Sequence, residues 1–312
     1  MASPVAVITN PADPSNHLLF FLNGSTQQLA MEVRSVDGST PITPFVNNGP
    51  STGSIQVNPL AAVLKKNVPT VYGTSQPQGK SGPTYVSTVS PYYNPISQDK
   101  GAQTTTPGLA ACSNGDANDW VYYLRQPDGQ VGYQVTEFLV DGINTTPMSS
   151  WTSAVASSNS NLAAVYFKAS QERFVIYSNT EKETRQKGLY WVNSNDATGY
   201  PIRTTSGLQP GTPLALTSME DKDSLSPYLN IYLYYMDNNM QLNRVVGRAR
   251  DSSITWFQSN VESTNFVYYI KDGGTTFERF QETVQPGWFK SPPALEEEEM
   301  VQRPAPDHDM GS

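Results

Sequence analysis

The chain has 312 residues, of which 15% are charged and 37% hydrophobic, and it contains 24 prolines and 22 glycines. This composition favours many short strands joined by turns over long helices. The net charge of −8 at pH 7 excludes the basic footprint that a nucleic-acid-binding protein needs. The sequence has no run of eighteen apolar residues, so we expect no membrane-spanning helix.

A short apolar phrase returns along the chain at intervals of 49 to 53 residues. Its copies begin at Leu60, Leu109, Leu162 and Leu214, and the first three read Leu-Ala-Ala followed by Val or Cys. Periods of this size are typical of propellers, solenoids and other repeat arrays. We therefore expect a single unit to be repeated along the chain.

Strand-forming runs follow the copies of this phrase. Aromatic and β-branched residues fill the runs 120–123, 174–177 and 231–235, and such runs favour β-strands. The same template fits a first unit that includes residues 5–21 and a last unit that includes residues 254–274. Six units of roughly fifty residues have the size of four-stranded propeller blades. We predict an all-β, six-bladed β-propeller with antiparallel four-stranded blades, in which the small-residue phrase forms the innermost strands.

The charge is unevenly distributed between two regions. We expect residues 1–290 to form a single propeller domain and residues 291–312 to form an acidic, disordered tail. Six acidic residues and one arginine lie in the tail, so the propeller itself is close to neutral. The first residues lack the basic and apolar regions of a signal peptide. The compartment stays open, because such a peptide could have been removed.

Few residues are available for nucleophilic or metal chemistry. The sequence contains two histidines, His17 and His308, and one cysteine, Cys112. A Ser-His-Asp apparatus would have to use His17, and a zinc site in the propeller would have one histidine and one cysteine. We expect neither, and we expect no cofactor. Cys112 lies in a small-residue strand, which favours a buried side chain over a reactive thiol.

The repeat resembles the fungal fucose-specific lectins, which are six-bladed propellers. The resemblance is carried by Asn-Pro-Leu-Ala-Ala-Val at residues 58–63, followed by a strand, a turn and a second strand, and it covers residues 4–290. It implies a sugar site between adjacent blades, with an arginine from the second strand, a glutamate from the third strand and an aromatic platform. In such a site the charged groups bind sugar hydroxyls and the ring stacks on the apolar sugar face.

The positions that bind sugar in that family hold other residue types here. The six arginine positions hold Leu18, Thr70, Trp120, Phe174, Tyr232 and Phe266, and the glutamate positions that can be aligned hold Met31, Tyr133, Arg244 and Arg279. Arg173 and Glu278 each lie one residue away from such a position, in different units. A ring leaves a sugar hydroxyl unsatisfied at a cost of about 1–3 kcal/mol. The clefts therefore favour an apolar or aromatic ligand.

A second, narrower resemblance is to the lectin-like hetero-Diels–Alderases of tropolonic sesquiterpenoid biosynthesis in fungi. It implies an inverse-electron-demand cycloaddition between a tropolone-type o-quinone methide and a humulene-type sesquiterpene alkene. Such an enzyme needs no cofactor. Its protein would hold two apolar reactants together, exclude water and place a hydrogen-bond donor on the enone oxygen.

Candidate residues for this chemistry come from the same positions. We assign the aromatic walls to Trp120, Tyr133, Phe174, Tyr232 and Phe266, and the donors to Arg173, Arg244 and Arg279, with Lys65, Lys66 and Lys168 behind the inner strands. The catalytic candidates are Tyr232 and Arg244, which occupy the paired positions of one unit, together with Arg173. Trp120, Tyr133, Phe174, Phe266 and Arg279 are the candidates for substrate binding.

Three functions stay open at this point. They are a pericyclic enzyme for small apolar or aromatic substrates, a lectin for fucosylated glycans, and a scaffold or unrelated hydrolase. The lectin resemblance also leaves a homodimer open. We expect no nucleic-acid partner.

Overall fold

The computed structural model describes most residues between 5 and 282. It leaves out residues 24–27, 36–44, 47–53, 56–59, 77–83, 97–105, 107, 128–131, 142–143, 181–186, 203–204, 206, 222–227, 240–241, 251–252, 258–264 and 271–276. The expected acidic tail, residues 291–312, lies outside the described residues. Within the described part, no helix is long and apolar enough to cross a membrane.

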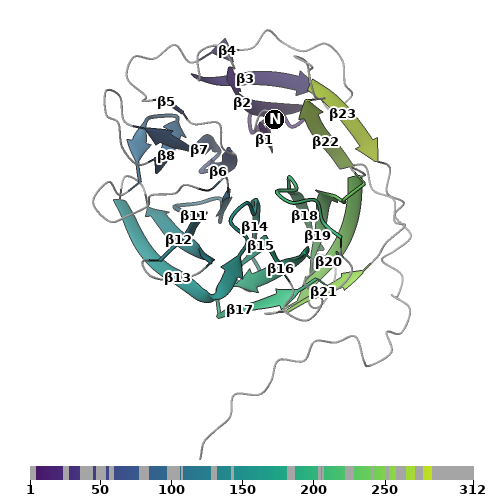
Figure 1. Cartoon of the computed structure of the whole chain (residues 1–312). Coiled ribbons are helices and arrows are strands. Elements are labelled where there is room, and N and C mark those ends of the chain that lie inside the picture. Colours follow the sequence, from purple (N-terminus) through teal and green to yellow (C-terminus); the bar gives the residue numbers. More distant parts are fainter. Residues whose placement is uncertain are drawn as a thin grey trace, which may run out of the picture.

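The described strands form six sheets that follow one another around a central axis, and we call them blades 1 to 6 (Figure 1). Blade 1 contains β1 (Val5–Thr9), β2 (Asn16–Asn23), β3 (Gln28–Ser35) and β4 (Phe45–Val46); blade 2 contains β5 (Ser54–Ile55), β6 (Ala61–Lys65), β7 (Val68–Gln76), β8 (Tyr85–Ser90) and β9 (Asn94–Pro95). Blade 3 contains β10 (Leu109–Ser113), β11 (Asn118–Arg125), β12 (Tyr133–Asp141) and β13 (Asn144–Ala156); blade 4 contains β14 (Leu162–Phe167), β15 (Glu172–Thr180), β16 (Lys187–Asn193) and β17 (Asp196–Pro201). Blade 5 contains β18 (Ala215–Asp221), β19 (Tyr228–Met236), β20 (Leu242–Arg250) and β21 (Ser253–Phe257), and the described strands of blade 6 are β22 (Asn265–Ile270) and β23 (Phe277–Glu282).

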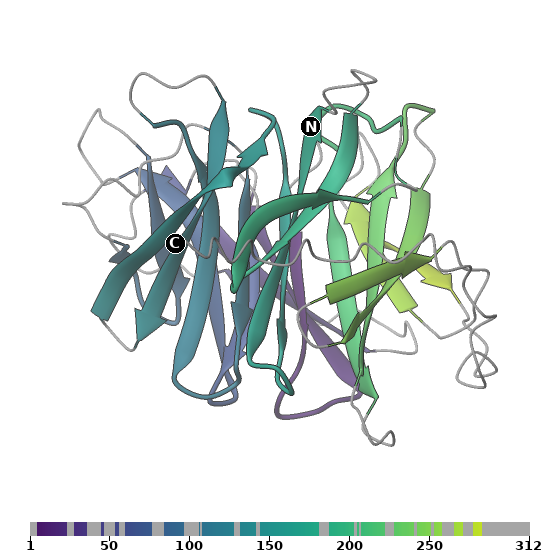
Figure 2. The ribbon, with the colours of Figure 1, turned by 90° about the horizontal axis from the view of Figure 1, so that it is seen from below.

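The strands of each blade are antiparallel neighbours in chain order, and blades stand side by side around the axis when seen from the edge (Figure 2). Four of the sheets have the expected four strands, and two differ. In blade 2, β5 and β6 both pair with β7, at opposite ends of that strand. In blade 6 the described part is one hairpin. The all-β propeller prediction is confirmed.

The second strand of a blade is buried on both faces. In β11 the five residues 120–124 are each at most 7% exposed, although their side chains alternate between the two faces of the sheet. A sheet that is covered on both faces favours continuous apolar runs. Neighbouring blades provide this cover, which explains why the second strands read as unbroken aromatic and β-branched sequence.

The small-residue phrase forms the inner strands, as predicted. Leu109 of β10 pairs with Tyr123 of β11, and Leu162 of β14 pairs with Tyr177 of β15. Between blades 3 and 4, one face of β10, β11 and β12 packs against the opposite face of β14, β15 and β16 in a single apolar cluster. We call this contact the 3–4 junction and name the other contacts between blades in the same way.

Candidate binding site between blades 3 and 4

Polar side chains gather at one end of several junctions, where the hairpin between the first and second strands of a blade turns. In each group at least one side chain lies at the end of the first strand or near the start of the second. The groups concerned are Lys65 with Asp119 (2–3 junction), Arg173 with Glu137 (3–4 junction), Glu172 with Asn195 (blade 4) and Arg248 with Asn230 (blade 5). The 3–4 junction has the most complete set of contacts.

An ion pair crosses the 3–4 junction. Nε of Arg173, at the start of β15, donates to Oε2 of Glu137 over 3.0 Å, and Nη2 donates to Oε1 over 3.2 Å. The Glu137 side chain, in β12, is 1% exposed and that of Arg173 is 15% exposed. Such a two-pronged contact fixes the plane of the guanidinium as well as its position. Glu137 therefore holds Arg173 in one orientation at the edge of the junction.

Tyr122 completes the surroundings of the carboxylate. Its hydroxyl donates to Oε2 of Glu137 over 2.6 Å, and Sγ of Cys112 lies 3.8 Å from the same hydroxyl. Burial is the main reason why the pKa of Tyr122 is raised well above its usual value, so the hydroxyl stays protonated and donates. Burial likewise raises the pKa of the Cys112 thiol. Cys112 is buried, as expected, and its protonated form is a weak nucleophile.

Arg173 keeps its positive charge. Burial alone would lower its pKa, but the hydrogen bonds and the negative charge of Glu137 outweigh this effect, and the pKa is raised above its usual value. The guanidinium is therefore a permanent donor whose charge is balanced within the protein. Its remaining N–H groups can serve a ligand without adding a net charge to the site.

Two aromatic rings complete the site. Trp120 of β11 stacks on Tyr166 of β14 with 5.4 Å between ring centroids and 10° between ring planes. Cζ of Arg173 lies 4.7 Å from the centroid of the Trp120 ring. Arg173 and Tyr166 are cross-strand partners, so Trp120 of blade 3 contacts both members of a pair on blade 4. The result is a guanidinium and a phenol ring side by side, held from behind by an indole.

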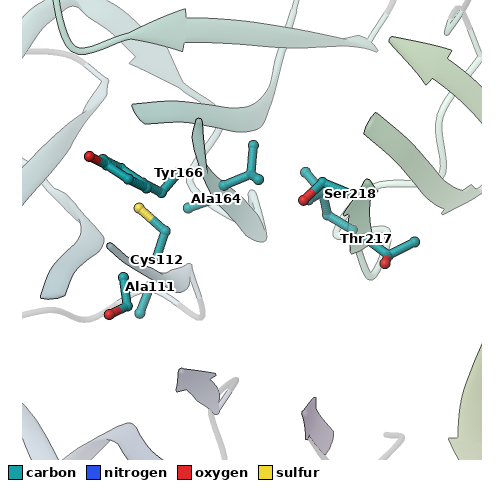
Figure 3. Close-up of a pocket in the computed structure, with 9 residues that line it drawn as sticks. Ala111, Cys112, Ala164, Tyr166, Thr217 and Ser218 are labelled. Atoms are coloured by element: carbon teal, nitrogen blue, oxygen red, sulfur yellow. The ribbon is translucent and has the colours of Figure 1, made fainter. Parts of the chain in front are cut away.

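Tyr166 also borders an open hollow of about 330 Å³ on the propeller axis. The hollow is lined by three consecutive residues from each of three inner strands, 111–113 of β10, 164–166 of β14 and 216–218 of β18. Figure 3 shows Cys112 and Tyr166 on one side of it and Thr217 and Ser218 on the other. The 3–4 junction and the axis thus meet at Tyr166.

The 2–3 junction has a different polar cluster. The Tyr72 hydroxyl donates to Oδ2 of Asp119 over 2.6 Å, and Nζ of Lys65 donates to the Val140 carbonyl over 2.9 Å and lies 4.0 Å from the same carboxylate oxygen. Asp119 is completely buried, and its pKa is raised because burial outweighs the hydrogen bonds and the Lys65 charge. Tyr72 belongs to β7 and Asp119 to β11, so this cluster joins blades 2 and 3.

The structure brings some of the predicted residues together. Arg173 contacts Trp120, and Tyr133 packs at the edge of the apolar cluster that contains Trp120. In blade 5, Tyr232 is 6% exposed and packs with Tyr234. Arg244 lies on the same face, directly opposite Tyr234.

Other predicted residues lie apart from the 3–4 site. Phe174 is completely buried in the cluster between blades 4 and 5. Lys66 and Lys168 are exposed in hairpin turns. Phe266 and Arg279 lie in β22 and β23, and their side chains are outside the described part of the structure.

Sequence reasoning missed Glu137, Tyr122 and Tyr166. The arginine position was paired with a glutamate of its own unit, whereas the partner of Arg173 comes from the third strand of the preceding blade, 36 residues earlier. A signal was present, because Glu137 is an acidic residue in the middle of a strand that otherwise has no charge between Tyr133 and Val140. Such an acid needs a buried partner.

No arrangement of three or more His, Cys, Asp or Glu side chains that could hold a metal ion occurs among the described residues.

Two groups of known proteins are similar to the chain, while no family model matches it. Among solved structures, the six-bladed fucose-recognising lectin of Aleuria aurantia superposes with a TM-score of 0.57 at 17% identity, covering 89% of this chain and 91% of the lectin. The SapL1 lectin in complex with α-methyl fucoside superposes with a TM-score of 0.54 at 13% identity, covering 91% of this chain and 97% of the lectin.

These two likenesses show a shared fold. Sequence similarity is much higher to wall-associated proteinases of two fungi. The chain is 40% identical to that of Coccidioides posadasii (strain RMSCC 757 / Silveira) and 39% identical to that of Coccidioides immitis (strain RS), in each case over 316 residues that cover 94% of this chain and 99% of the relative. The chain therefore belongs to the family of the Coccidioides wall-associated proteinases and has the six-bladed propeller fold of the fungal fucose-binding lectins.

Proposed function

We propose that the chain is a carbohydrate-binding protein of the lectin type and that it binds a neutral sugar at the edge of the 3–4 junction, beside Arg173 and Tyr166. Arg173 would donate hydrogen bonds to sugar hydroxyls, and the Tyr166 ring would pack against the apolar sugar face. The single observation that carries the proposal is the fixed guanidinium of Arg173, which Glu137 holds by two hydrogen bonds and Trp120 supports from one side.

The charge balance of the site supports a neutral ligand. Glu137 already neutralises Arg173, so an acidic sugar would place a second negative charge beside a buried carboxylate. A neutral sugar uses the free N–H groups of the guanidinium without that repulsion. Fucosides, which are bound in two of the solved lectin structures, are the first ligands to test. Wall polysaccharides come next, because the Coccidioides relatives are named wall-associated.

Proteolysis is the activity in the name of those relatives. His17 is the one histidine among the described residues, and its cross-strand partners are Thr9 and Arg34. A catalytic histidine is oriented by an acid, and neither of these two cross-strand partners is acidic. The geometry of the 3–4 junction therefore supports binding better than peptide hydrolysis.

The cycloaddition hypothesis has less support than carbohydrate binding. Phe174 and Tyr232, two of its expected aromatic walls, are 0% and 6% exposed and fill contacts between strands. The same purified chain can be tested with an o-quinone methide precursor and a sesquiterpene alkene. Stereoselective product formation would revive the hypothesis.

A glycan array tests the proposal directly. Fluorescently labelled chain should bind a subset of neutral glycans, and Arg173→Ala should lose that binding. Arg125→Ala is the matched control, because Arg125 lies at the exposed end of β11 and outside the junction. The proposal fails if the array shows no glycan binding, or if both variants keep the wild-type pattern.

A further inference from the structure

We infer that the hollow on the propeller axis is a second ligand site, and that it takes one neutral polyhydroxylated molecule of monosaccharide size. This inference rests on the proposed carbohydrate-binding function and extends it to a second place, which borders the 3–4 junction at Tyr166. It rests on an open hollow of about 330 Å³, which lies at the lower end of the size range of small-molecule pockets.

Strand edges supply hydrogen-bonding groups to the hollow. Each of the lining strands β10, β14 and β18 is the first in its sheet and pairs on one side only, and its other edge faces the axis (Figure 1). In an antiparallel strand every second residue directs both its N–H and its C=O toward the same edge. Three consecutive lining residues from each strand therefore present at least one donor and one acceptor to the hollow.

The side chains around the hollow are small and uncharged. Ala111, Ala164, Ser113 and Ser218 keep the space open, and the described lining residues include no acidic or basic side chain. Hydroxyl groups come from both serines and from Thr217. A charged ligand would lose its hydration without gaining an opposite charge. The lining thus selects for neutral ligands.

A sugar matches this mixture of groups better than other neutral ligands do. Each sugar hydroxyl both donates and accepts, as water does, so it can replace water at a strand edge where donors and acceptors lie close together. Thr217 and Ser218 are exposed to the hollow, and Tyr166, on the opposite side, is partly exposed (Figure 3). Ala111, Ala164 and Leu216 provide the apolar part of the lining.

The small residues of the hollow belong to the repeated phrase of the sequence. Residues 111 and 164 are the third positions of two copies, and both are alanine. A larger side chain would point into the 2–3 junction at residue 111 and into the 3–4 junction at residue 164, or would narrow the hollow. The small residues of the repeated phrase therefore form the inner strands and also keep the hollow open.

Isothermal titration with L-fucose, D-mannose, D-glucose and D-galactose tests the inference on the full chain. Ser218→Trp fills the hollow from β18 and leaves the 3–4 junction untouched. Met219→Trp is the matched control, because Met219 is the next residue of the same strand, is 44% exposed and does not line the hollow. Thr217→Trp is a second filling variant, in case Ser218→Trp unfolds, and circular dichroism checks that each variant is folded.

We expect at least one of these sugars to bind at two sites. Ser218→Trp and Thr217→Trp should remove one site and weaken its binding at least tenfold, Arg173→Ala should remove the other, and Met219→Trp should keep both. Binding that is lost with Arg173→Ala alone would overturn the inference and leave the proposed function standing. Binding that is lost with the filling variants alone would support the hollow and refute the junction site. If none of the four sugars binds to the wild-type chain, both are wrong.

Discussion

Arg173 is held by side chains from the neighbouring blade on two sides, a carboxylate and an indole ring. Neither contact lies within its own sheet. A buried ion pair of this kind contributes little net stability compared with a well-packed apolar pair, but the loss of one partner is costly because the other charge stays buried. The pair is therefore better explained by the need for a fixed donor than by stability.

Replacement of one member of the pair should expose this asymmetry. We expect Glu137→Gln to lower the free energy of unfolding by about 3–5 kcal/mol, because the Arg173 charge loses its counter-charge. The double variant Glu137→Leu with Arg173→Met should lose less free energy of unfolding than the single variants Glu137→Leu and Arg173→Met lose together. Urea denaturation at pH 7 measures all of these values. Additive effects would show that the two side chains do not interact.

Asp119 predicts a pH dependence with a definite sign. Its pKa is raised in the folded chain, mainly by burial, so the folded state binds more protons than the unfolded state between the usual and the raised pKa. The free energy of unfolding should therefore fall as the pH rises through that window. Asp119→Asn removes the titrating group and keeps an acceptor for Tyr72. Relative to this variant, the wild-type chain should be most stable in acid and lose its advantage toward neutral pH, as measured by urea denaturation from pH 3 to pH 7. A constant difference would contradict the shift.

Blades 4 and 5 each contain an equivalent hydrogen bond that the apolar sequence pattern does not predict. Ser160 and Thr212 each lie two residues before a copy of the phrase, and each hydroxyl accepts from a backbone N–H at the end of the second strand, Ser178 N over 2.7 Å and Met236 N over 2.7 Å. Each of the two residues also closes a turn onto a carbonyl three residues earlier. The same small device thus fixes the entry to blades 4 and 5.

Removal of this hydroxyl should destabilise the propeller. Ser160→Ala leaves the N–H of Ser178 buried without a partner, at a cost of about 1–3 kcal/mol. Ser158→Ala is the control, since Ser158 is exposed in the same turn. Thermal unfolding followed by circular dichroism should show a lower midpoint for Ser160→Ala alone, and equal midpoints would refute the role of the hydroxyl.

Gly108 limits how closely blade 3 approaches blade 4. A Cβ at this position would lie 2.7 Å from the backbone oxygen of Ser160 and 3.0 Å from Leu124. Because the oxygen belongs to the backbone, relief requires a shift of the strand, and we expect Gly108→Ala to cost about 1–3 kcal/mol in urea denaturation. Gly188→Ala is the control, because its Cβ would meet nothing closer than 4.0 Å. A wild-type midpoint for Gly108→Ala would show that the blades separate without cost.

At the scale of the whole molecule, the fold could be predicted from the sequence because a repeat shows the same local pattern in several units. The phrases at Leu60, Leu109 and Leu162 each begin or precede an inner strand, and the aromatic runs that follow them are the second strands. The pairing of β5 with β7 in blade 2 could not be predicted from the sequence, since β5 has only two residues, Ser54 and Ile55. Such a short segment has no periodicity.

Less of the candidate site than of the fold could be predicted from the sequence. Alternation along a strand predicts which face a side chain occupies, but it does not predict which residue of the neighbouring blade lies opposite. Arg173 was identified from its position in its own unit, while its contact with Glu137 and the stacking of Trp120 on Tyr166 depend on how blades 3 and 4 pack together. The partners of a junction depend on the packing of two sheets, and that packing has no local sequence signal.

The central claim is that the fixed guanidinium of Arg173 binds a neutral sugar. The most direct measurement is a titration of the best-bound array glycan against wild-type chain, Arg173→Lys and Arg125→Lys. Lysine keeps the charge but lacks the planar fork of donors that Glu137 and a sugar can share. We predict that Arg173→Lys weakens binding at least tenfold and that Arg125→Lys binds like the wild-type chain. Equal affinity of all three proteins would contradict the account.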